Sequence, residues 1–184
     1  MPITKQEAIS QMIWGFHDRD PRNLRRLNDR CIEQLALNFE KDFYNLAILA
    51  YALSKMSQKP RYWGNTKVTE YIKQIESNLK LAQQLLQQNK PSDFSSLLLG
   101  TVSIIDKIES ADRRYVRQPI EKAKLKIAAT LYAQGFSLGS ASEITGLDKR
   151  EILGYAGRTM MFDRVKPNLS VSDRLASVRK IFGK

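Results

Sequence analysis

The residues best suited to acid–base or metal chemistry are His17, Asp18 and Asp20, which lie within four positions of one another. An imidazole beside carboxylates can transfer protons or ligate a metal ion. His17 is the only histidine, however, and Cys31 is the only cysteine, so the nitrogen and sulfur ligands of an ordinary zinc site are lacking. We therefore interpret this stretch as a turn before Pro21, and we expect no metal site.

Other catalytic patterns are also missing from the sequence. It contains no phosphate-cradling glycine loop, no nucleophile elbow and no recognisable pair of catalytic carboxylates. Cys31 falls on an apolar stripe and is interpreted as a packing residue. We expect a protein that is not an enzyme and uses no cofactor.

The strongest chemical signal is positive charge. The chain of 184 residues carries 30 Lys and Arg against 19 Asp and Glu, a net charge of +11 with an isoelectric point near 9.8. Residues 1–110 hold 15 basic and 12 acidic side chains, whereas residues 111–184 hold 15 and 7. A basic excess favours polyanionic partners, namely nucleic acid or an anionic membrane surface. The shift in composition at residue 111 predicts two domains, 1–110 and 111–184.

Two basic runs are candidates for contact with such a partner. Arg113, Arg114 and Arg117 lead directly into the segment described next, and we include them among the nucleic-acid-binding residues. The run over residues 22–26 is interpreted instead as the solvated face of a helix.

Helix start and stop signals follow closely on one another after Pro119. A helix from Pro119 is expected to end at Gly135, a left-handed terminator. Ser137 precedes a short second helix over residues 139–145, which ends at Gly146. Asp148 is then placed to cap a third helix.

This arrangement resembles the helix-turn-helix superfamily of DNA-binding domains over about 40 of the 184 residues, roughly 119–158. A small residue, Ser142, stands four positions before the turn glycine, where two helices approach closely. Gly146 takes the turn, Leu147 follows as an apolar plug, and Ile152 occupies the apolar position six residues after the glycine.

The resemblance implies that the third helix enters the major groove while basic side chains and helix ends contact phosphates. It assigns five residues to the exposed face of that helix: Lys149, Arg150, Leu153, Gly154 and Arg158. Lys149 and Arg150 can bond guanine or phosphate, and Ser140 or Ser142 could reach phosphate from the second helix. Leu153 and Gly154 are poor readers of bases, so the surface favours backbone contact over sequence specificity.

The first 110 residues show apolar periodicity typical of helices rather than strands. Helices are expected over residues 5–15, 21–39, 42–56, 66–88 and 92–109, with a loop over residues 57–65. The second helix has an apolar stripe that includes Cys31 and Phe39, and the third is expected to be apolar round most of its circumference. Leu97, Leu98 and Leu99 are expected inside the fifth helix. A strand in the last of these segments is a weaker alternative because it contains a run of β-branched residues. Trp14, Tyr62 and Trp63 could form a binding cluster but are better explained as seals of the core. The fold class is therefore all-α: an N-terminal helical bundle followed by a C-terminal three-helix unit and a terminal helix over residues 170–182.

We predict that this chain is a nucleic-acid-binding protein that recognises duplex DNA, with transcription regulation as its role. The terminal helix has an apolar face that could serve a homodimer. No stretch approaches the roughly 20 apolar residues of a membrane span, and together with the single cysteine this fits a cytoplasmic protein. Two alternatives stay open: a helical protein-interaction adaptor, and a protein that binds structured RNA through shape and phosphate contacts.

Overall fold

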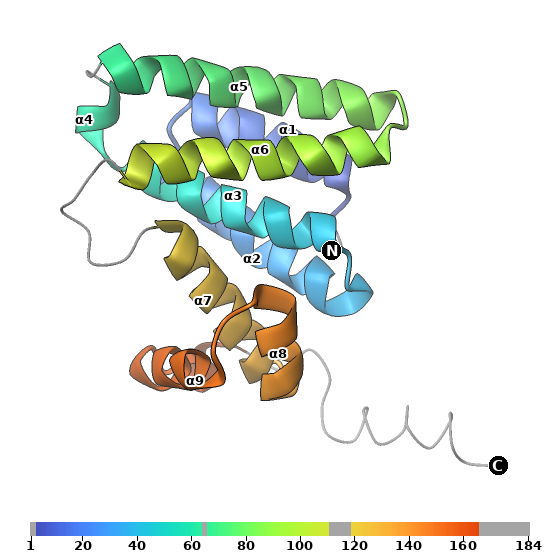
Figure 1. Cartoon of the computed structure of the whole chain (residues 1–184), viewed down its shortest axis with the longest axis vertical. Coiled ribbons are helices and arrows are strands. Elements are labelled where there is room, and N and C mark those ends of the chain that lie inside the picture. The colour runs from blue at the N-terminus through green and yellow to red at the C-terminus, as the bar shows by residue number, and fades with distance from the viewer. Residues whose placement is uncertain (1–2, 64–65, 111–118, 166–184) are drawn as a thin grey trace. The chain divides into compact units, whose positions relative to one another are not determined.

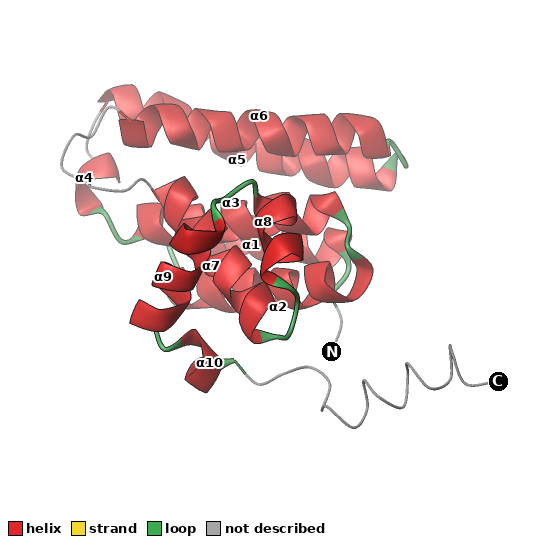
Figure 2. Ribbon diagram, turned by 60° about the horizontal axis from the view of Figure 1, so that its bottom comes forward, coloured by secondary structure: helices red, strands yellow, loops and turns green. Residues whose placement is uncertain are grey.

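The computed structural model describes residues 3–63, 66–110 and 119–165. All regular structure in these ranges is helical, and no strand occurs in them (Figures 1 and 2). The all-α prediction is therefore confirmed, including for the segment in which a strand was the weaker alternative. None of the described helices is long and apolar enough to cross a membrane.

The chain divides into two compact units, Met1–Ile127 and Ala128–Lys184, which we call the N-terminal bundle and the C-terminal unit. The bundle contains six complete helices among its described residues: α1 (Lys5–His17), α2 (Pro21–Asn38), α3 (Lys41–Ser57), α4 (Pro60–Trp63), α5 (Thr66–Gln87) and α6 (Pro91–Ser110). Helix α7 (Pro119–Ala133) begins in the bundle and ends in the C-terminal unit, which also holds α8 (Leu138–Thr145), α9 (Lys149–Arg158) and α10 (Met161–Arg164).

Side-chain caps set the starts of the first two helices. Thr4 and Glu7 form a capping box, in which the Glu7 amide donates to Thr4 Oγ1 at 3.2 Å and the Thr4 amide donates to Glu7 Oε2 at 3.0 Å. The Asp20 carboxylate accepts from the Arg22 amide at 2.9 Å, and Pro21 takes the first helical position. Asp20 therefore has a structural role at the start of α2, in agreement with the turn predicted there.

Helix α3 forms the centre of the bundle. It packs on α1, α2 and α6, while α5 packs on α1 and α6 (Figure 1). Twelve of its 17 residues are buried, and nine of these are apolar, as expected for a central helix. Helix α2 contributes a buried stripe that includes Leu24, Leu27, Cys31 and Leu35.

Three details of the predicted bundle were wrong. Phe39 does not continue the α2 stripe: it is 60% exposed and ends the helix with a left-handed φ of 55°. Residues Pro60–Trp63 form a short helix where a loop was expected. Leu99 is 49% exposed although it was expected in the core.

The first half of α7 belongs to the bundle through a polar contact with α2. Lys126 Nζ donates to Asn28 Oδ1 at 2.7 Å and pairs with Asp29 Oδ1 at 2.6 Å. Asn28 is itself fully buried and donates to the Ala47 carbonyl at 2.8 Å. The division between compact units consequently falls within α7, after Ile127, whereas the change in composition had placed it at residues 110 and 111.

Candidate nucleic-acid interface

Helices α7 and α8 are separated by a tight, capped connection. Gly135 has a φ of 99°, a left-handed value that favours glycine, and it lies two positions after Ala133, the last residue of α7. Ser137 is the N-cap of α8, since its hydroxyl oxygen accepts from the Ser140 amide at 2.9 Å. Both features were predicted from the sequence.

The turn between α8 and α9 is built around Gly146. This glycine has a φ of 70°, and its amide donates to the Ser142 carbonyl at 2.8 Å. The Ser142 hydroxyl donates across the turn to the Leu147 carbonyl at 2.6 Å. Asp148 then caps α9, its carboxylate accepting from the Arg150 amide at 2.7 Å. The turn is thus fixed on both sides by side-chain hydrogen bonds.

A small apolar cluster holds the three helices together. Ala128 of α7, Ala141 of α8 and Ile152 of α9 are all fully buried, and Leu138 and Leu147 pack against them. Alanine at two of the three central positions lets the helix backbones approach closely. A second cluster joins the end of α7 to α9 and α10 through Ala129, Ala133, Ala156 and Met161.

The outer face of α9 carries the residues that the sequence assigned to it. Lys149, Arg150, Leu153, Gly154 and Arg158 are all exposed. Neither Lys149 nor Arg150 forms an ion pair with any other residue that the structure describes. Both cations are thus presented to solvent at the N-terminal end of α9. Their exposure agrees with the prediction, while their contact with nucleic acid stays a prediction.

The two serines assigned to phosphate contact already have partners within the turn region. Ser142 uses its only hydroxyl proton on the Leu147 carbonyl, so it cannot donate to phosphate while that bond is kept. The Ser140 hydroxyl lies 2.8 Å from that of Ser137. Arg113, Arg114 and Arg117 lie outside the described residues, as does the expected terminal helix.

The charge of this region differs from that of the whole C-terminal part of the chain. Residues 128–165 contain four Lys or Arg and four Asp or Glu, so they are neutral overall. The excess positive charge after residue 110 belongs to residues 111–127 and 166–184. The described part of the C-terminal unit therefore has no net positive charge of its own, and Lys149 and Arg150 are two of its four basic residues.

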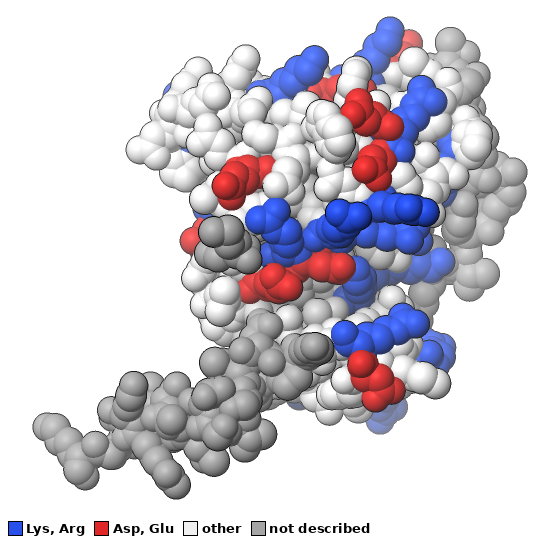
Figure 3. Space-filling view, turned by 180° about the vertical axis from the view of Figure 1, so that it is seen from behind, with Lys and Arg blue, Asp and Glu red and all other residues white. Residues whose placement is uncertain are grey.

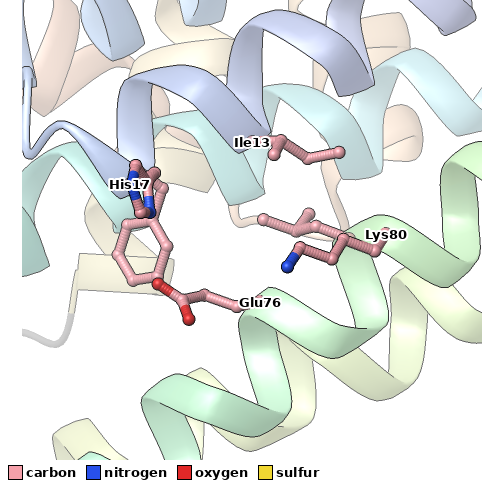
Figure 4. A pocket seen from close by; sticks show the side chains of 6 residues that line it. Ile13, His17, Glu76 and Lys80 are labelled. Carbon is pink, nitrogen blue, oxygen red and sulfur yellow. The ribbon is translucent and has the colours of Figure 1, made fainter.

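His17, the candidate residue for acid–base chemistry, borders a small hollow in the bundle. Ile13 and His17 of α1 lie on one side of it, and Glu76 and Lys80 of α5 lie on the other (Figure 4). Its volume is about 140 Å³, and Phe16 and Leu79 complete a mostly apolar lining. No group of three or more potential metal ligands occurs among the described residues. The hollow is too small for most organic ligands, which occupy about 300–1,000 Å³.

Two of the three aromatic residues interpreted as seals of the core, Trp14, Tyr62 and Trp63, agree with that interpretation. Tyr62 is buried, and Trp63 lies 5.7 Å from the Phe16 ring with the Arg19 guanidinium 4.0 Å from its own ring centre. These two residues fit the interpretation as seals of the core. Trp14 does not, because it is 56% exposed.

Comparison of the chain with protein-family models, curated proteins and solved structures finds no match to any of them.

Proposed function

We propose that this protein binds nucleic acid, with duplex DNA as the favoured form, through the helix-turn-helix arrangement of α7, α8 and α9. One observation carries the proposal. Lys149 and Arg150 stand exposed on the first turn of α9, directly after a left-handed glycine turn. In helix-turn-helix proteins the second helix of the pair lies in the major groove and contacts base edges through its N-terminal residues.

The chemistry of the α9 face suggests contact with the DNA backbone more than reading of bases. Arg150 can bond guanine O6 and N7 as a bidentate donor, and Lys149 can neutralise a phosphate. Farther along the same face, Leu153 and Gly154 offer no hydrogen-bond donor or acceptor in their side chains. A single strong base contact beside several phosphate contacts gives affinity with limited sequence preference. A role in transcription regulation is the proposed context for such binding.

The test is a binding titration with the full-length chain and a labelled duplex at two salt concentrations. We expect the logarithm of the binding constant to fall linearly with the logarithm of salt, by about 0.9 for each phosphate neutralised. Replacing both side chains with glutamine, in Lys149→Gln with Arg150→Gln, should weaken binding and reduce that slope by about one, because Lys149 is the phosphate contact of the pair. The charge-reversed pair Lys149→Glu with Arg150→Glu should abolish binding.

A matched control separates α9 from the general charge of the protein. Lys73 is an exposed lysine on α5 of the bundle, so Lys73→Glu changes the net charge without touching α9. Binding that falls equally in Lys73→Glu and in the α9 variants would contradict the proposal. Competition between duplex DNA and duplex RNA for one labelled probe distinguishes the two nucleic acids.

A second candidate function is protein docking by the C-terminal unit. Residues 128–165 are neutral overall, and α9 and the residues after it expose Leu153 (44%), Met160 (67%) and Phe162. Exposed apolar side chains of this size are typical of surfaces that contact another protein. Retention of a protein partner after nuclease treatment, together with its loss in Met160→Ser, would favour docking over nucleic-acid binding.

A further inference from the structure

A cationic hollow lies in the N-terminal bundle, between the last turns of α3 and the first turn of α7. Its volume is about 380 Å³. Six residues line it: Tyr51, Lys55, Gln58, Lys59, Pro119 and Lys122. Three of them are lysines and none is acidic. On the face of the molecule in Figure 3, Lys and Arg side chains lie next to one another in a band.

Lys55 lies in an electrostatically unfavourable position within this group. It is partly buried, and burial is the largest cause that lowers its pKa. The positive charges of Arg25, Lys122, Lys126 and Lys59 lower that pKa further. No carboxylate forms an ion pair with Lys55 in the described part of the chain. Within the described residues, this ammonium therefore lies among like charges and has no ion-pair partner.

The aromatic rings of the hollow help to hold the amines in place. Lys55 Nζ lies 5.5 Å from the centre of the Tyr51 ring, and Lys126 Nζ lies 5.8 Å from the same centre. Lys59 Nζ donates to the Tyr62 hydroxyl at 2.9 Å. Lys126 also forms an ion pair with Asp29. Ordered cations around an open volume form a prearranged site for an anion, because little side-chain freedom remains to be lost on binding.

We propose that this hollow binds a small molecule carrying a multiply charged phosphate group, such as a diphosphate or triphosphate. Lysine is a common ligand of phosphate, to which it presents a compact charge with three donors. A diphosphate offers several oxygen atoms that can accept hydrogen bonds from more than one of the lining lysines, whereas a single carboxylate offers two. The volume lies within the range of about 300–1,000 Å³ found for small-molecule sites. The site consists of bundle residues alone, so it does not depend on the proposed role of α9.

The experiment is calorimetric titration of the full-length chain with inorganic pyrophosphate, at constant ionic strength set by chloride. Saturable binding with one site per chain is expected. Lys55→Gln and Lys122→Gln should each weaken it about tenfold, since each removes one charge-assisted hydrogen bond. Lys73→Gln removes an exposed lysine of α5 and should leave the binding constant unchanged.

Folding of the variants is checked by thermal unfolding. Lys55→Gln removes a charge from a cluster of like charges, so the melting temperature without ligand should not fall. Pyrophosphate should raise the melting temperature of the native protein more than that of Lys55→Gln. A melting temperature that falls in Lys55→Gln, with an equal pyrophosphate shift in both proteins, would show that the lysine only supports the end of α3 and would overturn the proposal.

Three further outcomes decide the assignment. Absence of binding in the native protein, or equal weakening in Lys73→Gln, would refute the site. Displacement of pyrophosphate by a DNA duplex, with loss of duplex binding in Lys55→Gln, would refute the small-molecule assignment in favour of a nucleic-acid phosphate. Unchanged pyrophosphate binding in Lys149→Glu with Arg150→Glu would support a site separate from α9, whatever the result of the DNA titration.

Discussion

Two glycines of the C-terminal unit provide a sharp test of its geometry, because they have equally open surroundings but different backbone conformations. A methyl group added at Gly146 or at Gly154 would meet no atom within 4 Å. Gly154 lies in the middle of α9, whereas Gly146 has a left-handed φ of 70° at the turn. Steric contacts therefore predict no difference in stability between Gly146→Ala and Gly154→Ala. Backbone conformation alone determines whether each substitution stabilises or destabilises the unit.

The expected magnitudes follow from the two conformations. Alanine favours a helix interior over glycine by about 1 kcal/mol, so Gly154→Ala should stabilise α9 by up to that amount. A left-handed conformation costs a residue with a Cβ about 1–2 kcal/mol, and the restricted unfolded chain returns part of this. Gly146→Ala should therefore destabilise the unit by about 1 kcal/mol.

Amide hydrogen exchange, followed by mass spectrometry on peptides from α8 and α9, measures both effects locally. A change of about 1 kcal/mol corresponds to about a fivefold change in exchange rate where exchange reports the opening equilibrium. We expect slower exchange in Gly154→Ala and faster exchange in Gly146→Ala, with peptides from α3 unchanged in both. Slower exchange in Gly146→Ala would refute the left-handed turn at that position. Faster exchange in Gly154→Ala would refute the helical conformation of Gly154.

Three other perturbations test separate parts of the fold. Burial raises the pKa of the Cys31 thiol to about 12, so a thiol reagent should label the native protein at least about a thousandfold more slowly than the unfolded chain. Rapid labelling of the native protein would contradict a buried thiol. Burial of Lys5 disfavours its charged form, but hydrogen bonds to Asp42 and Glu40 outweigh burial and raise its pKa above 10.5. The stability that this charge adds is therefore present below about pH 10.5 and is lost at higher pH. Denaturant unfolding of Lys5→Gln should thus differ from the native protein below that pH and converge with it above, and a constant difference would exclude this linkage. Loss of the α8 cap in Ser137→Ala should cost about 1 kcal/mol, seen as faster exchange in α8 peptides alone.

Helix starts could be predicted from the sequence because their causes are local. The Thr4 box, the Asp20 cap with Pro21, and the Ser137 and Asp148 caps each depend on residues within three positions of the helix start. The same holds for the left-handed glycines that end α7 and α8. Such signals need no knowledge of the rest of the chain.

Burial was harder to predict because it depends on which neighbours a helix acquires. In the run over residues 97–99, three successive leucines were expected in the core, yet only Leu98 is fully buried and Leu99 is exposed. Three successive positions span most of a helical turn, so they cannot all face one neighbour. Phe39 continues the apolar spacing of α2, but the helix ends there and its backbone turns left-handed.

The cationic hollow could not be found from the sequence because Lys55 and Lys59 are more than 60 positions away from Lys122. Part of the signal was present. Tyr51 and Lys55 are spaced four residues apart, which places them on one face of α3, and Lys59 follows two positions after the end of that helix. Only the fold brings Lys122 to the same place.

This arrangement changes what the net charge says about function. Residues 111–184 hold 15 Lys and Arg, of which only four lie in residues 128–165. Lys122, which counts toward the basic excess of the C-terminal part, lines the bundle hollow, and Lys126 forms an ion pair with Asp29. The excess positive charge is therefore divided between at least two parts of the chain, and most of it does not lie at α9. The nucleic-acid proposal consequently depends on the geometry of Lys149 and Arg150 rather than on charge, so mutation of these two side chains tests it more directly than any measurement of net charge or salt dependence alone.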